Sequence, residues 1–199
     1  MPLIVLEGLD GCGKSTQATL LVERLQRTGK TVLRLREPGG TRLGEAIRTI
    51  LLDPTTEACA EAELFGYLVA RAQLCHEIIA PALARGEWVV LDRFWYSTIA
   101  YQAYGHGLDP VRVRAAIDLA VGGVRADAAL LLRITSVAAT TRRIARAMTD
   151  RIESRDASYH ARVEAGYAAL VTAGDLTAID ADGTPEAVGE RIWAAISKR

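Results

Sequence analysis

The feature that most limits the fold of this chain is the alternation of short apolar runs with longer segments in which apolar residues recur at helical spacing. Each run is nearly continuous in apolar residues, as is typical of strands buried on both faces of a parallel sheet. Parallel strands need crossover connections, which helices usually provide. We therefore expect an α/β fold, with a five-stranded parallel sheet flanked by helices. The expected strands are residues 3–7, 31–36, 88–92, 128–134 and 176–180, and the expected helices are residues 14–28, 62–85, 136–147, 157–172 and 185–197.

Composition narrows the class of protein and its partners. The chain has 199 residues, half of them hydrophobic, which suits one domain spanning residues 1–199. Basic and acidic residues number 24 each, so the chain lacks the excess positive charge of a general nucleic-acid binder. The three cysteines lie far apart and without metal-ligand spacing, which favours a reducing compartment. No apolar run resembles a signal peptide or approaches the roughly 18 residues that span a bilayer. We expect a soluble, cytoplasmic protein with neither nucleic acid nor a membrane as partner.

Residues 8–15, with the sequence GLDGCGKS, match the phosphate-binding pattern G-x-x-x-x-G-K-[ST]. The match lies between an expected strand and an expected helix, where glycines let backbone N–H groups surround phosphate oxygens and the helix N-terminus adds its dipole. We expect Lys14 to reach the transferred phosphate and the Ser15 hydroxyl to bind Mg²⁺. A glycine-rich turn without a ligand is the alternative. The residues expected to hold ATP are Gly8, Leu9, Asp10, Gly11, Cys12, Gly13, Lys14, Ser15 and Thr16.

Two further strand ends carry polar residues. The strand at residues 88–92 ends in Asp92, which could hold the metal through water, and Arg93 beside it offers a bidentate fork for an acceptor phosphate. Alternatively, Asp92 only caps the next helix and Arg93 is solvated. Residues 36–41, REPGGT, follow another strand, and taken alone they indicate an ordinary turn.

Four arginines, Arg142, Arg143, Arg146 and Arg151, fall within ten residues. Their guanidinium groups repel one another unless an anion gathers them, and a mobile flap that closes over transferring phosphates would supply that anion. A solvated basic helix face is the alternative.

Taken in order, these stretches resemble the thymidylate kinase family of nucleoside monophosphate kinases over nearly the full chain. The resemblance rests on residues 7–16, on residues 36–41, on Asp92-Arg93 followed by residues 97–102, and on residues 150–153. It implies a P-loop NTPase fold of the nucleoside monophosphate kinase type, an acceptor site within about residues 36–110 and a lid at about residues 142–156. It also implies a homodimer that transfers the γ-phosphoryl group of ATP to dTMP with Mg²⁺.

The resemblance also implies roles for single residues. Gly11 stands where one branch of the family has an arginine, so this chain looks like the bacterial type, whose catalytic arginines lie in the lid. Tyr67 stands where the family usually stacks a phenylalanine on thymine. The implied catalytic residues are Asp10, Lys14, Arg93, Arg143, Arg146 and Arg151, and the implied metal-binding residues are Ser15 and Asp92. The implied dTMP site is Asp10, Arg36, Glu37, Arg48, Tyr67, Arg71, Arg93, Thr98, Tyr101 and Gln102.

Other functions stay open on the residues alone. A monophosphate kinase for dUMP or a purine nucleotide would differ only in its acceptor. A nucleotide-hydrolysing binding switch would carry a guanine-reading motif such as N-K-x-D, which this sequence lacks. A catalytically silent relative would be expected to lose charged residues that are all present here. His76 and His106 are interpreted as structural or solvent-facing, and the apolar helix around residues 62–80 is the candidate dimer surface.

Overall fold

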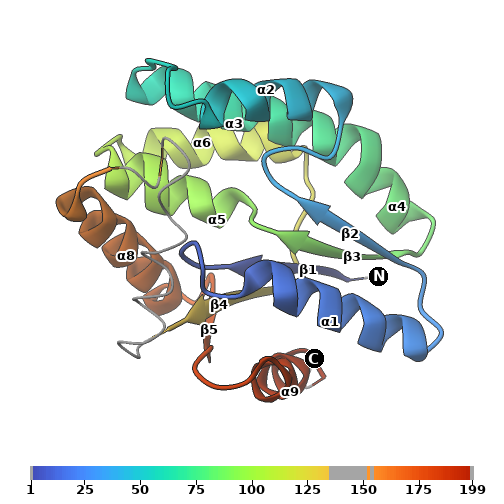
Figure 1. Cartoon of the computed structure of the whole chain (residues 1–199). Coiled ribbons are helices and arrows are strands. Elements are labelled where there is room, and N and C mark those ends of the chain that lie inside the picture. Colours follow the sequence, from blue (N-terminus) through green and yellow to red (C-terminus); the bar gives the residue numbers. More distant parts are fainter. Residues whose placement is uncertain (1, 135–151, 153–154, 198–199) are drawn as a thin grey trace.

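The computed structural model describes residues 2–134, 152 and 155–197, and its centre is a five-stranded parallel sheet of order β2-β3-β1-β4-β5 (Figure 1). The five predicted strands are confirmed, with ends that move by at most one residue. The strands are β1 (Leu3–Glu7), β2 (Val32–Arg36), β3 (Trp88–Asp92), β4 (Ala128–Arg133) and β5 (Thr177–Asp180).

Helices connect the strands, as a parallel sheet requires. The predicted helix at residues 62–85 is one continuous helical run made of α3, η1 and α4, and the predicted helix at residues 136–147 lies outside the described residues. Three helical regions, α2, α5 with η2, and α6, were not predicted. The helices are α1 (Lys14–Arg27), α2 (Arg42–Leu52), α3 (Ala60–Leu74), α4 (Ala80–Ala84), α5 (Trp95–Thr98), α6 (Pro110–Val121), α8 (Ala157–Thr172) and α9 (Pro185–Ile196), with π-helices η1 (Cys75–Ile79) and η2 (Ile99–Gly105). Within the described ranges, no helix combines the length and apolar character needed to cross a membrane.

Two apolar layers cover the sheet, one on each face. In β1, Leu3 and Val5 pack with α3, α6 and α8, whereas Ile4 and Leu6 face α1 and α9. Successive side chains of a strand point to opposite faces, so burial on both sides explains why the central strands β1, β3 and β4 have continuous apolar sequences. The sheet is therefore the rigid middle layer of the molecule.

Strand register brings three loops together at one edge of the sheet. Leu6 of β1 lies opposite Asp92 of β3, and Asp92 lies opposite Arg36 of β2. The segments that follow these residues therefore leave the sheet side by side, at the carboxyl edge where open α/β sheets bind ligands.

Candidate active site

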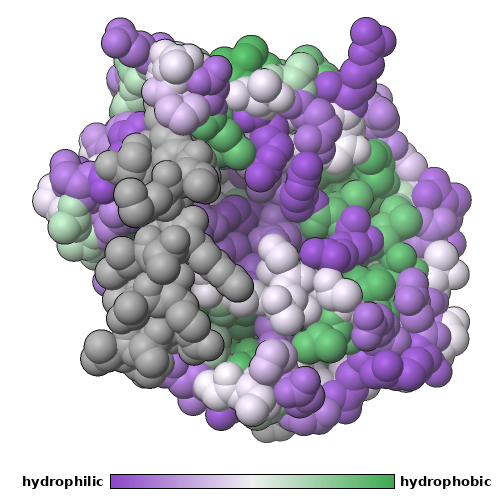
Figure 2. All heavy atoms as spheres, viewed as in Figure 1, coloured by the Kyte–Doolittle hydropathy of each residue, from purple (hydrophilic) through white to green (hydrophobic). Residues whose placement is uncertain are grey.

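A cavity of about 320 Å³ lies at this carboxyl edge. Its walls come from the loop before α1, the turn after β2, the helices α2 and α3, the end of β3, and η2. Hydrophilic side chains gather near the centre of this face of the molecule, between α2 and α3 above and α1 below (Figure 2). Of the predicted site residues that the structure describes, all line the cavity except Gly8, Leu9 and Cys12.

The loop of residues 8–13 wraps tightly between β1 and α1. Gly8 has a φ of 138°, and a side chain there would lie 2.7 Å from the carbonyl oxygen of Leu132. Gly13 begins α1 in the left-handed region, with a φ of 94°. Since neither conformation suits a residue with a side chain, both glycines are required by the path of the backbone.

Lys14 is buried, and its ammonium group turns back into the loop. Its Nζ donates to the carbonyl oxygens of Gly8 at 3.0 Å and Leu9 at 2.9 Å, and lies 3.4 Å from Asp10 Oδ1. Gly8 and Leu9 thus contribute to the site through their backbone. Cys12 is buried, with its sulfur 4.0 Å from the same ammonium group.

Ser15 and Asp92 form the pair expected of a metal site. The Ser15 hydroxyl donates to Asp92 Oδ2 at 2.7 Å, across 77 positions of sequence. Both are oxygen donors, the type that Mg²⁺ prefers, and both face the cavity. The alternative in which Asp92 caps the next helix is wrong, because the N-cap of α5 is Phe94.

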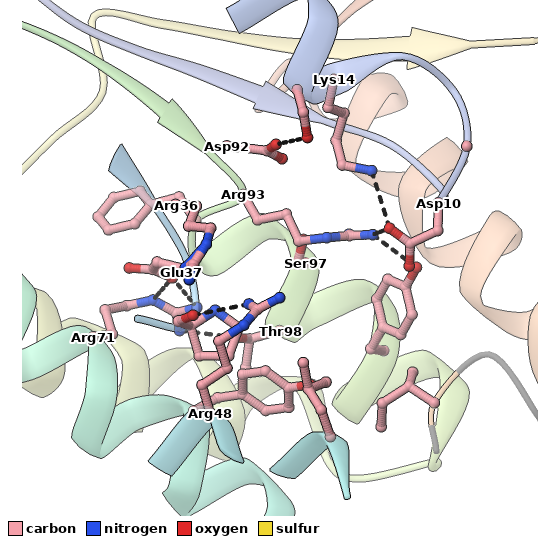
Figure 3. Close-up of a pocket in the computed structure, with 18 of the residues that line it drawn as sticks. Asp10, Lys14, Arg36, Glu37, Arg48, Arg71, Asp92, Arg93, Ser97 and Thr98 are labelled. Carbon is pink, nitrogen blue, oxygen red and sulfur yellow. Dashed lines mark hydrogen bonds and ion pairs between the residues drawn. The ribbon is translucent and has the colours of Figure 1, made fainter. Parts of the chain in front are cut away.

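Arg93 crosses the middle of the cavity (Figure 3). Its Nη2 lies 2.7 Å from Asp10 Oδ1, and its side chain is only 15% exposed, so the solvated alternative is also wrong. Its φ of 69° is in the left-handed region, which is strained for a residue with a side chain. Burial opposes its charge, but the neighbouring Asp10 holds the pKa of Arg93 well above its usual value. The guanidinium is therefore a permanent cation at a fixed place.

A second arginine lies deeper, beside Glu37. Arg71 donates to Glu37 Oε2 through Nε at 2.8 Å and pairs with it through Nη2 at 2.6 Å, while Nη1 donates to Thr98 Oγ1 at 2.9 Å. Burial raises the pKa of Glu37, against the opposing charge of Arg71. Glu37 Oε1 is buried and has no hydrogen-bond partner among the described residues. This wall of the cavity thus presents arginine N–H groups and an acceptor oxygen.

The remaining acceptor-site residues surround this wall. Arg36 is exposed and pairs with Glu45 at 3.1 Å, and Arg48 donates to the carbonyl oxygen of Pro38 at 2.9 Å. Figure 3 shows Arg36, Arg48 and Arg71 gathered around Glu37. The aromatic rings of Tyr67 and Tyr101 and the amide of Gln102 complete the lining.

Gln102 is itself held by a buried carboxylate. Its Nε2 donates to Glu63 Oε1 at 3.0 Å, and His106 Nε2 lies 2.8 Å from the same oxygen. His106 therefore has the structural role expected of it, and His76 is exposed. Tyr101 and Gln102 both belong to η2, and π-turns of this kind are frequent at functional sites.

The predicted lid arginines Arg143, Arg146 and Arg151 lie outside the described residues. Within the expected lid range, Ile152 lines the cavity and Arg155 pairs with Glu63 at 2.8 Å. The lid assignment stays a prediction.

Comparison with known proteins agrees with this geometry. The family model described as Thymidylate kinase matches residues 6–192 of the chain. The chain belongs to the thymidylate kinase family. It is 43% identical over 200 residues to a thymidylate kinase of Synechococcus sp., covering 98% of this chain and 95% of that protein. It is 42% identical over 205 residues to a thymidylate kinase of Solidesulfovibrio magneticus, covering 98% of both.

A solved thymidylate kinase structure, from Ehrlichia chaffeensis, superposes with a TM-score of 0.82 at 27% identity and covers 98% of each chain. The expected P-loop kinase fold and membership of the thymidylate kinase family are thereby confirmed, and the protein is a kinase. The individual roles of the site residues are not tested by these comparisons.

Sequence reasoning missed several residues of the site. Ser97 and Glu7 stand inside the motifs that carried the resemblance but received no role, and Tyr167 of α8 belongs to no motif. All three bond with one another behind Arg93. Spacing gives no signal for such a contact, because 160 positions separate Glu7 from Tyr167.

Proposed function

We propose that this thymidylate kinase family member transfers the γ-phosphoryl group of ATP to dTMP, giving ADP and dTDP, with Mg²⁺ as cofactor. The observation that carries the proposal is that one cavity holds both halves of such a reaction. Lys14, Ser15 and Asp92 lie on one side, Arg71 and its polar neighbours lie on another, and Arg93 extends between them.

The donor half is the loop of residues 8–16. Lys14 exchanges its bonds to backbone carbonyls for phosphate oxygens, since its ammonium group already lies within the loop. Mg²⁺ would be held by Ser15 and, directly or through water, by Asp92, because their oxygens already lie together. Held by these residues, Mg²⁺ would supply positive charge to offset that of the transferring phosphates.

The acceptor half is built around Arg93 and Arg71. Arg93 would hold the phosphate of dTMP chiefly through its permanent charge, because Nη1 and Nη2 already donate to neighbouring side chains. Nη1 of Arg71 uses one N–H on Thr98, so it keeps a second N–H for the base. An arginine can donate to a keto oxygen but cannot accept from an amino group, which favours thymine over cytosine. Tyr67 would offer a flat face to the base, and Tyr101 would lie by the sugar.

The mechanism needs no general base. A phosphate oxygen of dTMP is itself the nucleophile, so catalysis consists of positioning and charge neutralisation. Lys14, Arg93 and the metal would spread the charge that develops in transfer, and the arginines of residues 143–151 would add to it when the lid closes.

The first test is an ADP-release assay with ATP and Mg²⁺. It compares dTMP, dUMP, dCMP, dGMP, UMP and no acceptor. We expect turnover with dTMP, weaker or no turnover with the other nucleotides, and none without an acceptor. Fastest turnover with another nucleotide would move the proposal to that monophosphate kinase, and turnover independent of any acceptor would favour a hydrolytic switch.

We also propose a homodimer formed through α3. Phe65 and Val69 lie one helical turn apart on α3, and they are 58% and 42% exposed. Large apolar side chains grouped this way are typical of protein interfaces. Phe65→Asp should convert a dimer into a monomer in light scattering after gel filtration. Ala194→Asp, an exposed site on α9 at the opposite face of the sheet, is the control and should remain dimeric. A monomeric wild type would reject the dimer.

A cytoplasmic location is proposed from the cysteines. Cys12, Cys59 and Cys75 are all free thiols. Free thiols suit a reducing compartment, so fractionation of the source cells should recover the protein with cytoplasmic markers.

A further inference from the structure

Glu7, the last residue of β1, is a fully buried carboxylate directly behind Arg93. Its Oε1 accepts from the backbone N–H groups of Phe94 at 2.8 Å and Ser97 at 3.3 Å. Its Oε2 accepts from the Ser97 hydroxyl at 2.5 Å and from the Tyr167 hydroxyl at 3.0 Å. Four donors thus converge on one carboxylate that does not line the cavity.

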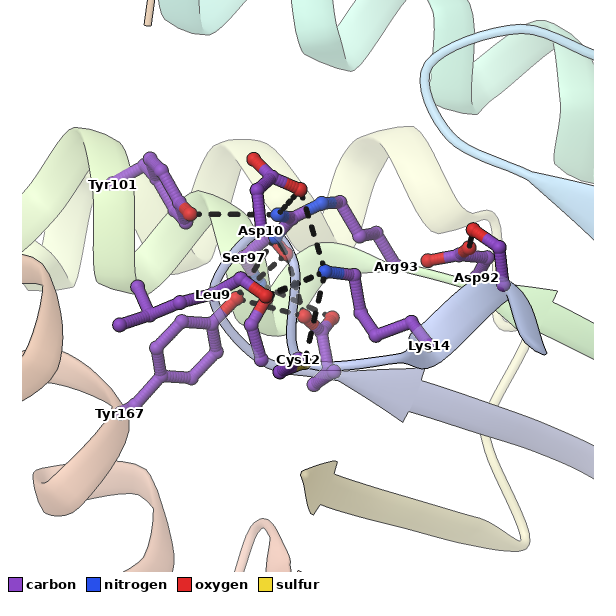
Figure 4. Close-up of polar contacts among 12 residues, drawn as sticks. Leu9, Asp10, Cys12, Lys14, Asp92, Arg93, Ser97, Tyr101 and Tyr167 are labelled. Atoms are coloured by element: carbon purple, nitrogen blue, oxygen red, sulfur yellow. Dashed lines mark hydrogen bonds and ion pairs between the residues drawn. The ribbon is translucent and has the colours of Figure 1, made fainter. Parts of the chain in front are cut away.

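The two hydroxyls join Glu7 to Arg93. Nη1 of Arg93 donates to Ser97 Oγ at 3.1 Å and to the Tyr167 hydroxyl oxygen at 3.2 Å (Figure 4). A guanidinium can only donate, so both hydroxyl oxygens must turn lone pairs toward it. Each hydroxyl has a single proton, and the two hydroxyls also lie 3.0 Å apart, so at least one of the two protons must be donated to Glu7. Glu7 is the acceptor at the end of this group and so orients the hydroxyls that face Arg93.

We propose that Glu7 is a positioning residue which, through Ser97 and Tyr167, fixes the guanidinium of Arg93 for the acceptor phosphate. The inference rests on the proposed function, in which Arg93 holds that phosphate. Glu7 touches neither substrate. It acts by holding one edge of the guanidinium, while Nη2 is held by Asp10 at 2.7 Å and by the Tyr101 hydroxyl at 3.4 Å.

The backbone at Arg93 supports the same role. Its φ of 69° is unfavourable, and such a conformation persists only where neighbouring bonds enforce it. Arg93 N donates to the carbonyl oxygen of Leu6 at 2.9 Å, and the next residue, Phe94, donates to Glu7. Two consecutive residues of β1 thus hold the turn that aims Arg93 into the cavity. Burial raises the pKa of Glu7, and the charge of Arg93 and the hydrogen bonds of Ser97, Phe94 and Tyr167 oppose that rise.

The test is Glu7→Gln, which keeps the shape of the side chain. The amide oxygen still accepts from the two N–H groups, but the amide nitrogen donates, so it cannot receive the hydroxyl protons. We expect kcat/KM for dTMP to fall about 10- to 100-fold, the range for a lost hydrogen bond to a charged group, mainly through a higher KM for dTMP. The KM for ATP should stay within about twofold, because the donor half is intact.

Glu87→Gln is the matched control. Glu87 pairs with Arg85 at 2.9 Å, just before β3 and so at the opposite edge of the sheet, and its loss should leave both KM values unchanged. Unfolding temperatures of all variants are measured in parallel. If Glu7→Gln does not fold, Tyr167→Phe carries the test, since it removes one of the two hydroxyls and leaves the ring. We expect it to raise the KM for dTMP several-fold.

The double variant Glu7→Gln/Tyr167→Phe distinguishes a positioning role of Glu7 from a nonspecific loss of structure. If Glu7 acts through the hydroxyls, Glu7→Gln should cost less in the Tyr167→Phe background than in the wild type. Additive effects, an unchanged KM for dTMP, or a fall in kcat alone with both KM values intact would each overturn the inference. A wild type that does not phosphorylate dTMP would instead reject the proposed function, so the two failures are distinguishable.

Discussion

Glu63 of α3 offers the sharpest test of how this site is held together. The carboxylate is fully buried, and it accepts from Gln102 at 3.0 Å, bonds with His106 at 2.8 Å and pairs with Arg155 at 2.8 Å. It therefore joins α3, the end of η2 and Arg155, which lies two residues before the start of α8. We predict that Glu63→Gln, which removes the charge and keeps the shape, destabilises the fold.

The size of the expected loss in stability follows from how deeply Glu63 and its ion-pair partner Arg155 are buried. Breaking a buried ion pair on one side costs about 3–5 kcal/mol. Arg155 is 23% exposed, so water compensates part of its lost partner, and we expect a loss of about 2–3 kcal/mol. In a chain of this size, 1 kcal/mol corresponds to about 2–4 °C in Tm. The expected fall is therefore about 4–12 °C near neutral pH.

The effect should depend on pH in a fixed direction. Burial alone would raise the pKa of Glu63, but the hydrogen bond from His106 and the charge of Arg155 hold it below the usual value of 4.5. A carboxyl whose pKa is lower in the folded state stabilises the fold above its unfolded pKa, and this stability is lost as pH falls through the folded pKa. The difference in Tm between wild type and Glu63→Gln should thus be largest near pH 7 and shrink below 4.5.

Thermal unfolding, followed by circular dichroism near pH 7 and again below pH 4.5, measures this difference in Tm. Glu77→Gln is the control, because Glu77 is exposed and bonds only with Gln73 among the described contacts, so its Tm should change little. A difference between wild type and Glu63→Gln below about 2 °C near pH 7, or one of equal size at both pH values, would refute the reasoning.

Three other predictions concern packing, metal and base. Gly166→Ala should lose about 1–3 kcal/mol in thermal unfolding, because the new methyl group would lie 2.9 Å from Ala100 Cα; an unchanged Tm would contradict it. Asp92→Asn should raise the Mg²⁺ concentration for half-maximal activity about tenfold and leave the KM for dTMP unchanged, and a magnesium titration decides this. Tyr67→Ala should weaken dTMP binding by about 1–3 kcal/mol in calorimetry, whereas Tyr67→Phe, which keeps the ring, should bind within about threefold of wild type.

The three central strands, β1, β3 and β4, could be predicted because both their faces are buried, which leaves almost no polar residue inside them. Two of the helices that were not predicted, α2 and α6, follow residues typical of a helix N-cap. Thr41 caps α2 by accepting from Gly44 N, and Asp109 caps α6 directly before a proline. The region of α5 and η2 gave none, because nearly all of its residues are buried and a π-helix has no common sequence pattern.

Some residues of the site could likewise be predicted from the sequence, and others could not. Residues that belong to a contiguous motif, such as Lys14 and Arg93, could be found from the sequence because chemistry fixes their local spacing. Glu7 with Tyr167 and Glu63 with Arg155 could not, since each pair joins segments that lie far apart in the chain and meet only in the folded protein. The packing of α8 against η2 brings Tyr167 to the site.

The strand order also governs when this protein can fold during synthesis. β1 leaves the ribosome before the other four strands, yet it lies in the middle of the sheet, between β3 at residues 88–92 and β4 at residues 128–133. Until residue 133 has emerged, the edge of β1 that pairs with β4 has no neighbouring strand, and the apolar side chains of β1 are only partly covered. Nascent chains that stall before that point expose an unpaired edge of a strand with five buried positions, which is a substrate for chaperones and a seed for aggregation. The loop of residues 8–13 is thus made before both strands that flank β1, and it can take its final shape only after both have emerged.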